Sequence, residues 1–168
     1  MRVTRGLSGG ARFRVANAIG AMVIAGFGIS AAMANVAPPT ADVVVSDLAH
    51  RSPDIHWPPG FLPESADMFS YSEIMINANY STVWRHLVAA SHWPEWYPNA
   101  HDVRLPDIER GILREHTRFE WNTFGVHIDS TVNEYVPENR LGWFGKRPSV
   151  AAYHTWLLAP VADGLPLS

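Results

Sequence analysis

The stretch from Ile76 to Pro98 constrains the fold of this chain more than any other part of its sequence. It reads INANYSTVWRHLVAASHWPEWYP. A strand pattern ends at Asn77, and the residues that follow place Trp84 and Leu87 on one side of a short amphipathic helix. Two prolines in the WPEWYP segment then confine a second short helix. Strand signals dominate from there onward, so the sequence predicts one strand, two cramped helices and then a sheet.

Alternating apolar and polar residues predict antiparallel strands that are separated by turn signals. The expected strands are 68–77, 102–105, 117–122, 126–136, 140–146 and 151–158. In the long strand 126–136, a spacing of two residues places Glu134 on the same face as Val132. We therefore predict an α+β fold: a curved antiparallel sheet of about six strands, with two short helices after the first strand.

Residues 1–34 have the composition of a targeting segment. Their four arginines precede a charge-free run from Val15 to Ala32, and Ala32-Met33-Ala34 fits the small-x-small cleavage rule. A retained membrane anchor is the alternative, because 16–34 is nearly long enough to span a bilayer. We predict a periplasmic or secreted protein that meets a membrane only if this segment is retained. We also expect residues 1–34 to pack against no other part of the chain.

The composition of residues 35–63 predicts a Pro-rich linker that ends in a segment docked on the domain. They hold six prolines and lack a clear hydrophobic period. Trp57 and Phe61 are too apolar for a solvated linker, so we expect residues 56–61 to lie on the domain that 64–168 forms. The folded part is expected to begin near Asp54.

Composition and motifs exclude several classes of function. Removing residues 1–34 would lower the net charge from −3 to −7, since they contain four Arg and no acidic residue; an acidic domain favours neither nucleic acid nor an anionic membrane. The chain has no cysteine, and its eight histidines form no metal-binding motif. It also lacks the glycine-rich nucleotide-binding motifs and the G-x-S-x-G motif. We therefore expect no cofactor and no metal.

Three segments carry a family resemblance. They are the WPEWYP segment, the hairpin in which Glu134 precedes Arg140-Leu141-Gly142-Trp143, and the aromatic strand Tyr153-His154-Thr155-Trp156. Together with the element order they resemble the SRPBCC (START-like, helix-grip) superfamily, specifically its polyketide cyclase/dehydrase and lipid-transport group. The resemblance covers roughly Phe69 to Gly164. It implies a cavity between sheet and helices that binds a small hydrophobic molecule.

The superfamily pattern continues with a further strand and a long C-terminal helix after a last turn, which here falls at 162–164. We therefore expect an incomplete helix-grip domain, truncated at its C-terminus. Its last strand, 151–158, is expected to keep an unpaired edge that favours self-association. The exposed aromatic face is expected to be wet or covered, either by residues 54–63 or by a second molecule.

The resemblance also points to functional residues. Aromatic side chains are expected to contact the ligand or to form plain core, and we expect Trp96 to be buried; they are Trp96, Tyr97, Phe119, Trp121, Trp143 and Trp156. An alternative function is a cyclase or dehydratase acting on polyketide-like substrates, with Glu134, Tyr153 and His154 as the acid–base candidates. The favoured interpretation of Glu134 is a structural carboxylate that is hydrogen-bonded to the hairpin or paired with Arg140. A third alternative is a truncated, non-functional product.

Overall fold

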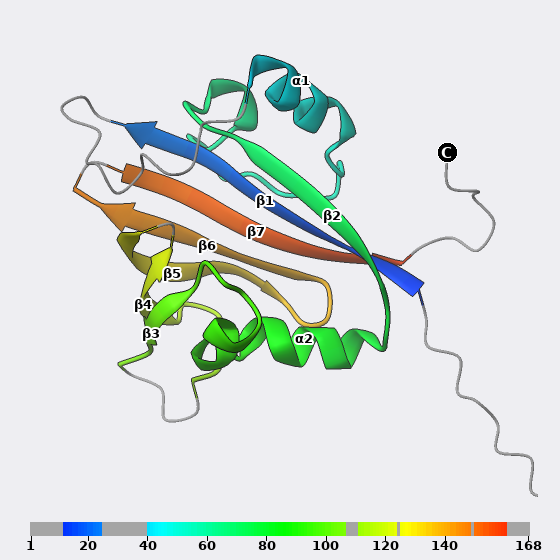
Figure 1. Ribbon diagram of the computed structural model, residues 1–168, viewed down its shortest axis with the longest axis vertical. Coiled ribbons are helices and arrows are strands. Elements are labelled where there is room, and N and C mark those ends of the chain that lie inside the picture. Colours follow the sequence, from blue (N-terminus) through cyan, green and yellow to red (C-terminus); the bar gives the residue numbers. More distant parts are fainter. Residues whose placement is uncertain (1–11, 25–39, 107–110, 124, 149, 161–168) are drawn as a thin grey trace, which may run out of the picture.

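The computed structural model describes residues 12–24, 40–106, 111–123, 125–148 and 150–160. In this part of the chain seven strands form one antiparallel sheet in the order β2-β1-β7-β6-β5-β4-β3 (Figure 1). The strands are β1 (Arg12–Ile24), β2 (Ser70–Asn77), β3 (His101–Arg104), β4 (Arg118–Thr123), β5 (Val126–Val136), β6 (Arg140–Arg147) and β7 (Val150–Pro160).

The helices are short. They are the α-helices α1 (Ala41–His50) and α2 (Tyr80–Val88) and the 3₁₀ helices η2 (Pro63–Ser65) and η3 (Ala90–Glu95). The predicted α+β fold is therefore confirmed, with α2 and η3 as the two short helices after the first predicted strand. The six predicted strands correspond to β2 through β7. No helix in the described ranges is long and apolar enough to cross a membrane.

The strand that the sequence did not predict is β1. Every residue of β2 pairs with a residue between Arg12 and Ile19, and β7 pairs along the other side of β1. The expectation that residues 1–34 pack against nothing is therefore wrong for 12–24, and so is the expected unpaired edge of the last strand. The physical reason is that β1 supplies hydrogen-bond partners to two strands at once. Whether the segment is also a targeting signal stays a prediction.

The hydrophobic core consists of two clusters, one on each face of the sheet, and adjacent residues of β7 belong to different clusters. Leu158 belongs to the larger cluster, which contains residues of α2 and η3. Leu157 belongs to a smaller cluster with Ile55, Phe69 and the partly buried Leu48 of α1. Neighbouring side chains of a strand point to opposite faces. We call the side of α2 and η3 the helix face, and the side of α1 and the 52–63 segment the back face.

The N-terminal covering of the back face differs in part from the prediction. Residues 41–50 form α1 rather than an extended linker, because no proline interrupts 40–52 and Asp42 stands in the first turn of the helix. The expected docking of residues 56–61 is confirmed. The rings of Trp57 and Phe61 each lie 6.2 Å from that of Tyr153, measured between centroids. This segment lies on the back face, so it does not cover the aromatic residues of the helix face.

Candidate ligand site

Seven aromatic rings line a hollow on the helix face, which encloses about 170 Å³ including a part open to solvent. They belong to Trp93, Trp96, Tyr97, Trp121, Trp143, His154 and Trp156. Four of them are buried and form the floor: Trp93, Trp121, Trp143 and His154. The exposed Trp96 and the half-buried Tyr97 and Trp156 form the rim.

The WPEWYP segment supplies one wall of the hollow. Trp93 is only 3% exposed; its Nε1 donates a hydrogen bond to the carbonyl oxygen of Leu87 at 2.9 Å, which ties η3 to α2. Its ring stacks on that of Trp143, with centroids 5.3 Å apart. Trp96 stands just after η3 and is 41% exposed. The expectation that Trp96 is buried is therefore wrong: the helical turn directs Trp93 inward instead.

Strands β4, β6 and β7 supply the opposite wall. Trp143 and His154 are direct cross-strand partners, and their ring centroids lie 4.3 Å apart. Directly opposed residues of an antiparallel pair share one face, which brings both rings to the helix face. Trp121 approaches His154 to 6.3 Å and donates from Nε1 to the hydroxyl oxygen of Ser130 at 3.1 Å. The polar edge of Trp121 is thus satisfied inside the protein.

The hollow carries no charge at neutral pH. Complete burial lowers the pKa of His154 to about 3, so its imidazole stays neutral. Burial raises the pKa of Tyr97, which therefore keeps its proton. The other five lining residues are tryptophans, whose side chains carry no charge at any ordinary pH. The lining therefore favours uncharged molecules.

Most of the predicted ligand-binding residues meet at this hollow. Trp96, Tyr97, Trp121, Trp143 and Trp156 all line it. Phe119 instead lies behind the lining, 1% exposed and packed against the rings of Trp93, Trp121 and Trp143. Sequence reasoning missed Trp93 as a lining residue, because its burial depends on how η3 is oriented against the sheet. Contact of any of these side chains with a ligand stays a prediction.

The three predicted acid–base residues do not converge. His154 lies in the hollow, whereas its neighbour Tyr153 packs on the back face against Trp57 and Phe61. Glu134 also lies on the back face, because a β-bulge between Val132 and Glu134 breaks the alternation of β5. The expectation that Glu134 shares a face with Val132 is therefore wrong. Burial raises the pKa of Tyr153 to about 12, and Glu134 nearby adds to this rise.

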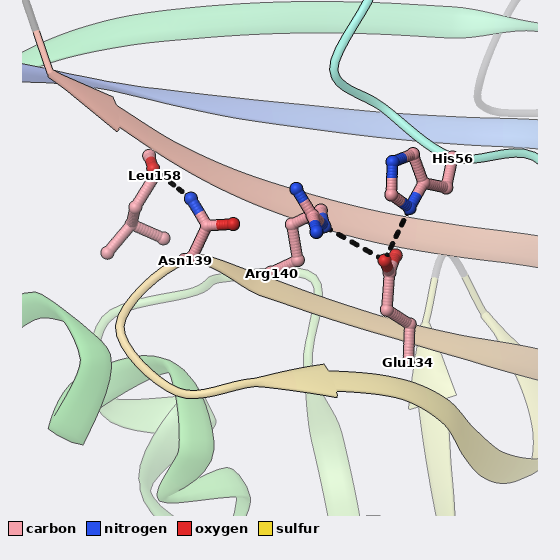
Figure 2. A network of polar contacts seen from close by, with 5 residues as sticks. All are labelled: His56, Glu134, Asn139, Arg140 and Leu158. Carbon is pink, nitrogen blue, oxygen red and sulfur yellow. Dashed lines mark hydrogen bonds and ion pairs between the residues drawn. The ribbon is translucent and has the colours of Figure 1, made fainter.

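Glu134 joins the hairpin to the N-terminal segment (Figure 2). Its Oε1 accepts a hydrogen bond from Nε of Arg140 at 2.9 Å and another from Nδ1 of His56 at 2.8 Å. At the hairpin turn, Nδ2 of Asn139 donates to the carbonyl oxygen of Leu158 at 3.0 Å. These contacts match the structural alternative for Glu134, in which the carboxylate pairs with Arg140.

Comparison with known proteins gives the same family as the sequence motifs. The family model described as polyketide cyclase / dehydrase and lipid transport matches residues 70–168. The chain belongs to this family. No curated protein matches the chain.

One similar solved structure is the 1.88 Å crystal structure of the hypothetical protein jhp0584 from Helicobacter pylori, with 24% sequence identity and a TM-score of 0.38. The match covers 49% of this chain and 63% of the Helicobacter pylori protein. This chain therefore spans less than two thirds of the length of that protein.

Membership of the polyketide cyclase/dehydrase and lipid-transport family suggests a hydrophobic ligand. In the described ranges of this family member, no three His, Asp or Glu side chains come close enough to hold a metal ion. The chemistry that the hollow offers is therefore that of its aromatic faces and one neutral imidazole.

Proposed function

We propose that this protein binds a small, uncharged, apolar molecule with at least one flat ring in the hollow on the helix face. The observation that carries the proposal is the lining itself, which consists of seven aromatic rings without a charged group. Aromatic faces stack on flat rings with centroid separations of about 4.5–7 Å. A charged ligand would lose its hydration here without gaining a partner.

The size of the hollow limits the ligand. The packed rings leave room between them for little more than one water molecule, although the wider hollow, including its part open to solvent, measures about 170 Å³. A ring-bearing ligand therefore requires the rim to open. Trp96 is the rim residue best placed to move, because it is 41% exposed; its ring lies 6.1 Å from that of Tyr97 and 6.5 Å from that of Trp156, measured between centroids.

Binding is favoured over acid–base catalysis. A general base works best when its pKa lies near the working pH, and His154 has a pKa of about 3. Glu134 and Tyr153, the other two predicted catalytic residues, lie across the sheet from it. His154 is therefore poorly suited to remove a proton from a ligand.

We further propose that the protein acts outside the cytoplasm, as the composition of residues 1–34 supports. Cleavage after Ala34 would remove β1 together with the targeting segment. The intact mass of the protein recovered from the periplasm and medium of an expressing bacterium tests this. Recovery of a chain that begins at Asn35 would support export, and recovery of the uncleaved chain from the cytoplasm alone would contradict it.

Native mass spectrometry of the gently purified protein tests the binding proposal. We expect a fraction of the wild-type protein to carry one small molecule, and the Trp143→Ala variant to lose it because one of the four floor rings is removed. Phe144→Ala is the matched control, because the Phe144 ring lies on the back face against Phe61 and Tyr153. This variant should keep the molecule. An apolar compound that both variants retain equally would argue against the hollow as its site.

A further inference from the structure

One end of the sheet carries a longer edge strand than the other. The edge strand β3 has four residues and packs against η3, whereas the edge strand β2 has eight residues with neither proline nor lysine. In the ranges that the structure describes, β1 is the strand that pairs with β2, and no strand lies on its outer side. Edges of this kind are templates for pairing with another chain unless proline, lysine or a bulge blocks them.

One hydrogen bond fixes which backbone groups of β2 point outward. The backbone N–H of Tyr71 donates to Oδ2 of Asp47, a residue of α1, at 2.9 Å. The backbone of Tyr71 is therefore directed away from β1. Since the backbone direction alternates along a strand, Met75 and Asn77 also direct their N–H and C=O groups outward. Asp47 occupies the edge at Tyr71.

Three consecutive apolar side chains stand in the second half of this edge strand, which otherwise carries mostly exposed polar residues. Ile74 is 61% exposed, Met75 is 36% exposed, and Ile76 is half-buried. When a second strand adds to the sheet, exposed isoleucine and methionine side chains of the edge strand are partly buried, and this burial of apolar surface is favourable. This edge therefore favours an apolar strand as its partner.

We propose that β2 pairs antiparallel with β2 of a second copy of this chain, with Met75 opposite Met75. This register places Ile74 of each copy opposite Ile76 of the other on the helix face, and Glu73 opposite Asn77 on the back face. Roughly six backbone hydrogen bonds form across the two-fold axis. The partner is a second copy because this register pairs each exposed isoleucine with an isoleucine of the other copy and keeps the two Glu73 carboxylates from facing each other.

The alternative registers are less favourable. A two-fold axis at Glu73 places two carboxylates directly opposite each other, which is destabilising. An axis at Ile74 requires Asn77 of the second copy to pair with Tyr71, where Asp47 already binds. The axis at Met75 avoids both conflicts. Within each copy, the chain leaves β2 toward α2 on the helix face, whereas α1 lies on the back face.

The absence of cysteine allows a direct test. The experiment uses the full chain, and its intact mass shows that β1 is still present. The Met75→Cys substitution then introduces one thiol into each copy. Cα atoms of a hydrogen-bonded pair lie about 5.5 Å apart, within the range of a disulfide. Under mild oxidation we expect Met75→Cys to form a covalent dimer at least about tenfold faster than Val45→Cys, because a paired strand raises the local thiol concentration. Val45 is 66% exposed on α1 and serves as the control.

Two further variants keep the result unambiguous. Ile74→Cys should cross-link slowly by itself, because the diagonal separation of about 7–8 Å exceeds disulfide reach. Ile74→Lys should convert the dimer to a monomer in light scattering and keep the circular-dichroism spectrum of the folded chain, since the Ile74 side chain is exposed in one copy. A wild-type chain that stays monomeric, or equal cross-linking rates for Met75→Cys and Val45→Cys, would overturn the proposal. Faster cross-linking of Ile74→Cys than of Met75→Cys would overturn the register.

Discussion

The indole of Trp93 stacks on the indole of Trp143 across the interior of the helix face, with ring centroids 5.3 Å apart and planes inclined by 29°. One ring comes from the short helix η3 and the other from the centre of β6. This pair joins the WPEWYP segment to the sheet, and it also forms part of the floor of the hollow. Stability and binding therefore depend on the same residues at this point.

Trp93→Ala is predicted to destabilise the protein far more than Trp96→Ala. Trp93 is 3% exposed and Trp96 is 41% exposed, so only the first substitution removes a buried ring and leaves a cavity. Such a loss costs about 3–5 kcal/mol. Urea denaturation of the two variants measures the difference in the free energy of unfolding. Equal losses would mean that Trp96 is held in the core.

Glu134→Gln is predicted to lower the free energy of unfolding by about 1–3 kcal/mol, because it weakens the charged contact with Arg140 and the contact with His56. His56→Ala should cost less, since the His56 side chain is 60% exposed. Denaturation melts of the single variants and of the Glu134→Gln/His56→Ala pair separate the two contacts. A purely additive pair would show that His56 and Glu134 do not interact in solution.

His154 is predicted to make the protein less stable at acidic pH. Burial lowers its folded-state pKa to about 3, below the unfolded value of about 6.5. The unfolded chain therefore binds the proton more readily. The stability that the neutral ring contributes is complete above about pH 6.5 and falls by roughly 1.4 kcal/mol for each pH unit below it. His154→Phe should flatten this dependence between pH 6.5 and pH 4.

The control for this prediction is His86→Phe, which replaces an exposed histidine. It should keep the wild-type slope of unfolding free energy against pH. If His154→Phe keeps that slope as well, then His154 takes up a proton in the folded protein.

Removing residues 1–34 is predicted to destabilise the sheet. The deletion takes away β1, to which every residue of β2 is paired, and it uncovers one side of β7. We expect the melting temperature to fall by at least about 10 °C, which corresponds to roughly 2 kcal/mol in a small domain. Deletion of residues 1–11, which keeps β1, is the matched control. Identical melting of the full chain and the 35–168 chain would show that β1 does not hold the sheet together.

Local patterns predicted much of the fold. Strand β5 spans 126–136 as expected, because its residues alternate between the two faces as far as Val132 and turn signals bound it on both sides. The helix α2 follows from an apolar side that carries Trp84 and Leu87. Five of the six predicted ligand-binding residues line the hollow. Trp121, Trp143 and Trp156 do so because residues of neighbouring antiparallel strands gather on one face, whereas Trp96 and Tyr97 come from the WPEWYP segment.

The parts that sequence reasoning missed depend on long-range geometry. The charge-free run that contains most of β1 has the composition of a targeting segment, and only pairing with the distant β2 and β7 identifies it as a strand. The face of Glu134 depends on a one-residue bulge, which a period of two residues does not encode. The burial of Trp93 rather than Trp96 depends on how η3 is oriented against the sheet, and local sequence does not determine this.

Titration with 2-naphthol, an uncharged fluorescent probe with one small fused ring system, tests the hollow as a binding site most directly. We predict saturable binding of one probe by the wild-type chain, and about tenfold weaker binding by Trp156→Ala, which corresponds to a loss of about 1.4 kcal/mol. Phe61→Ala, which removes a half-buried ring from the back face, should bind as tightly as the wild type. Absence of saturable binding, or an equal loss of affinity in both variants, would contradict a ligand site on the helix face.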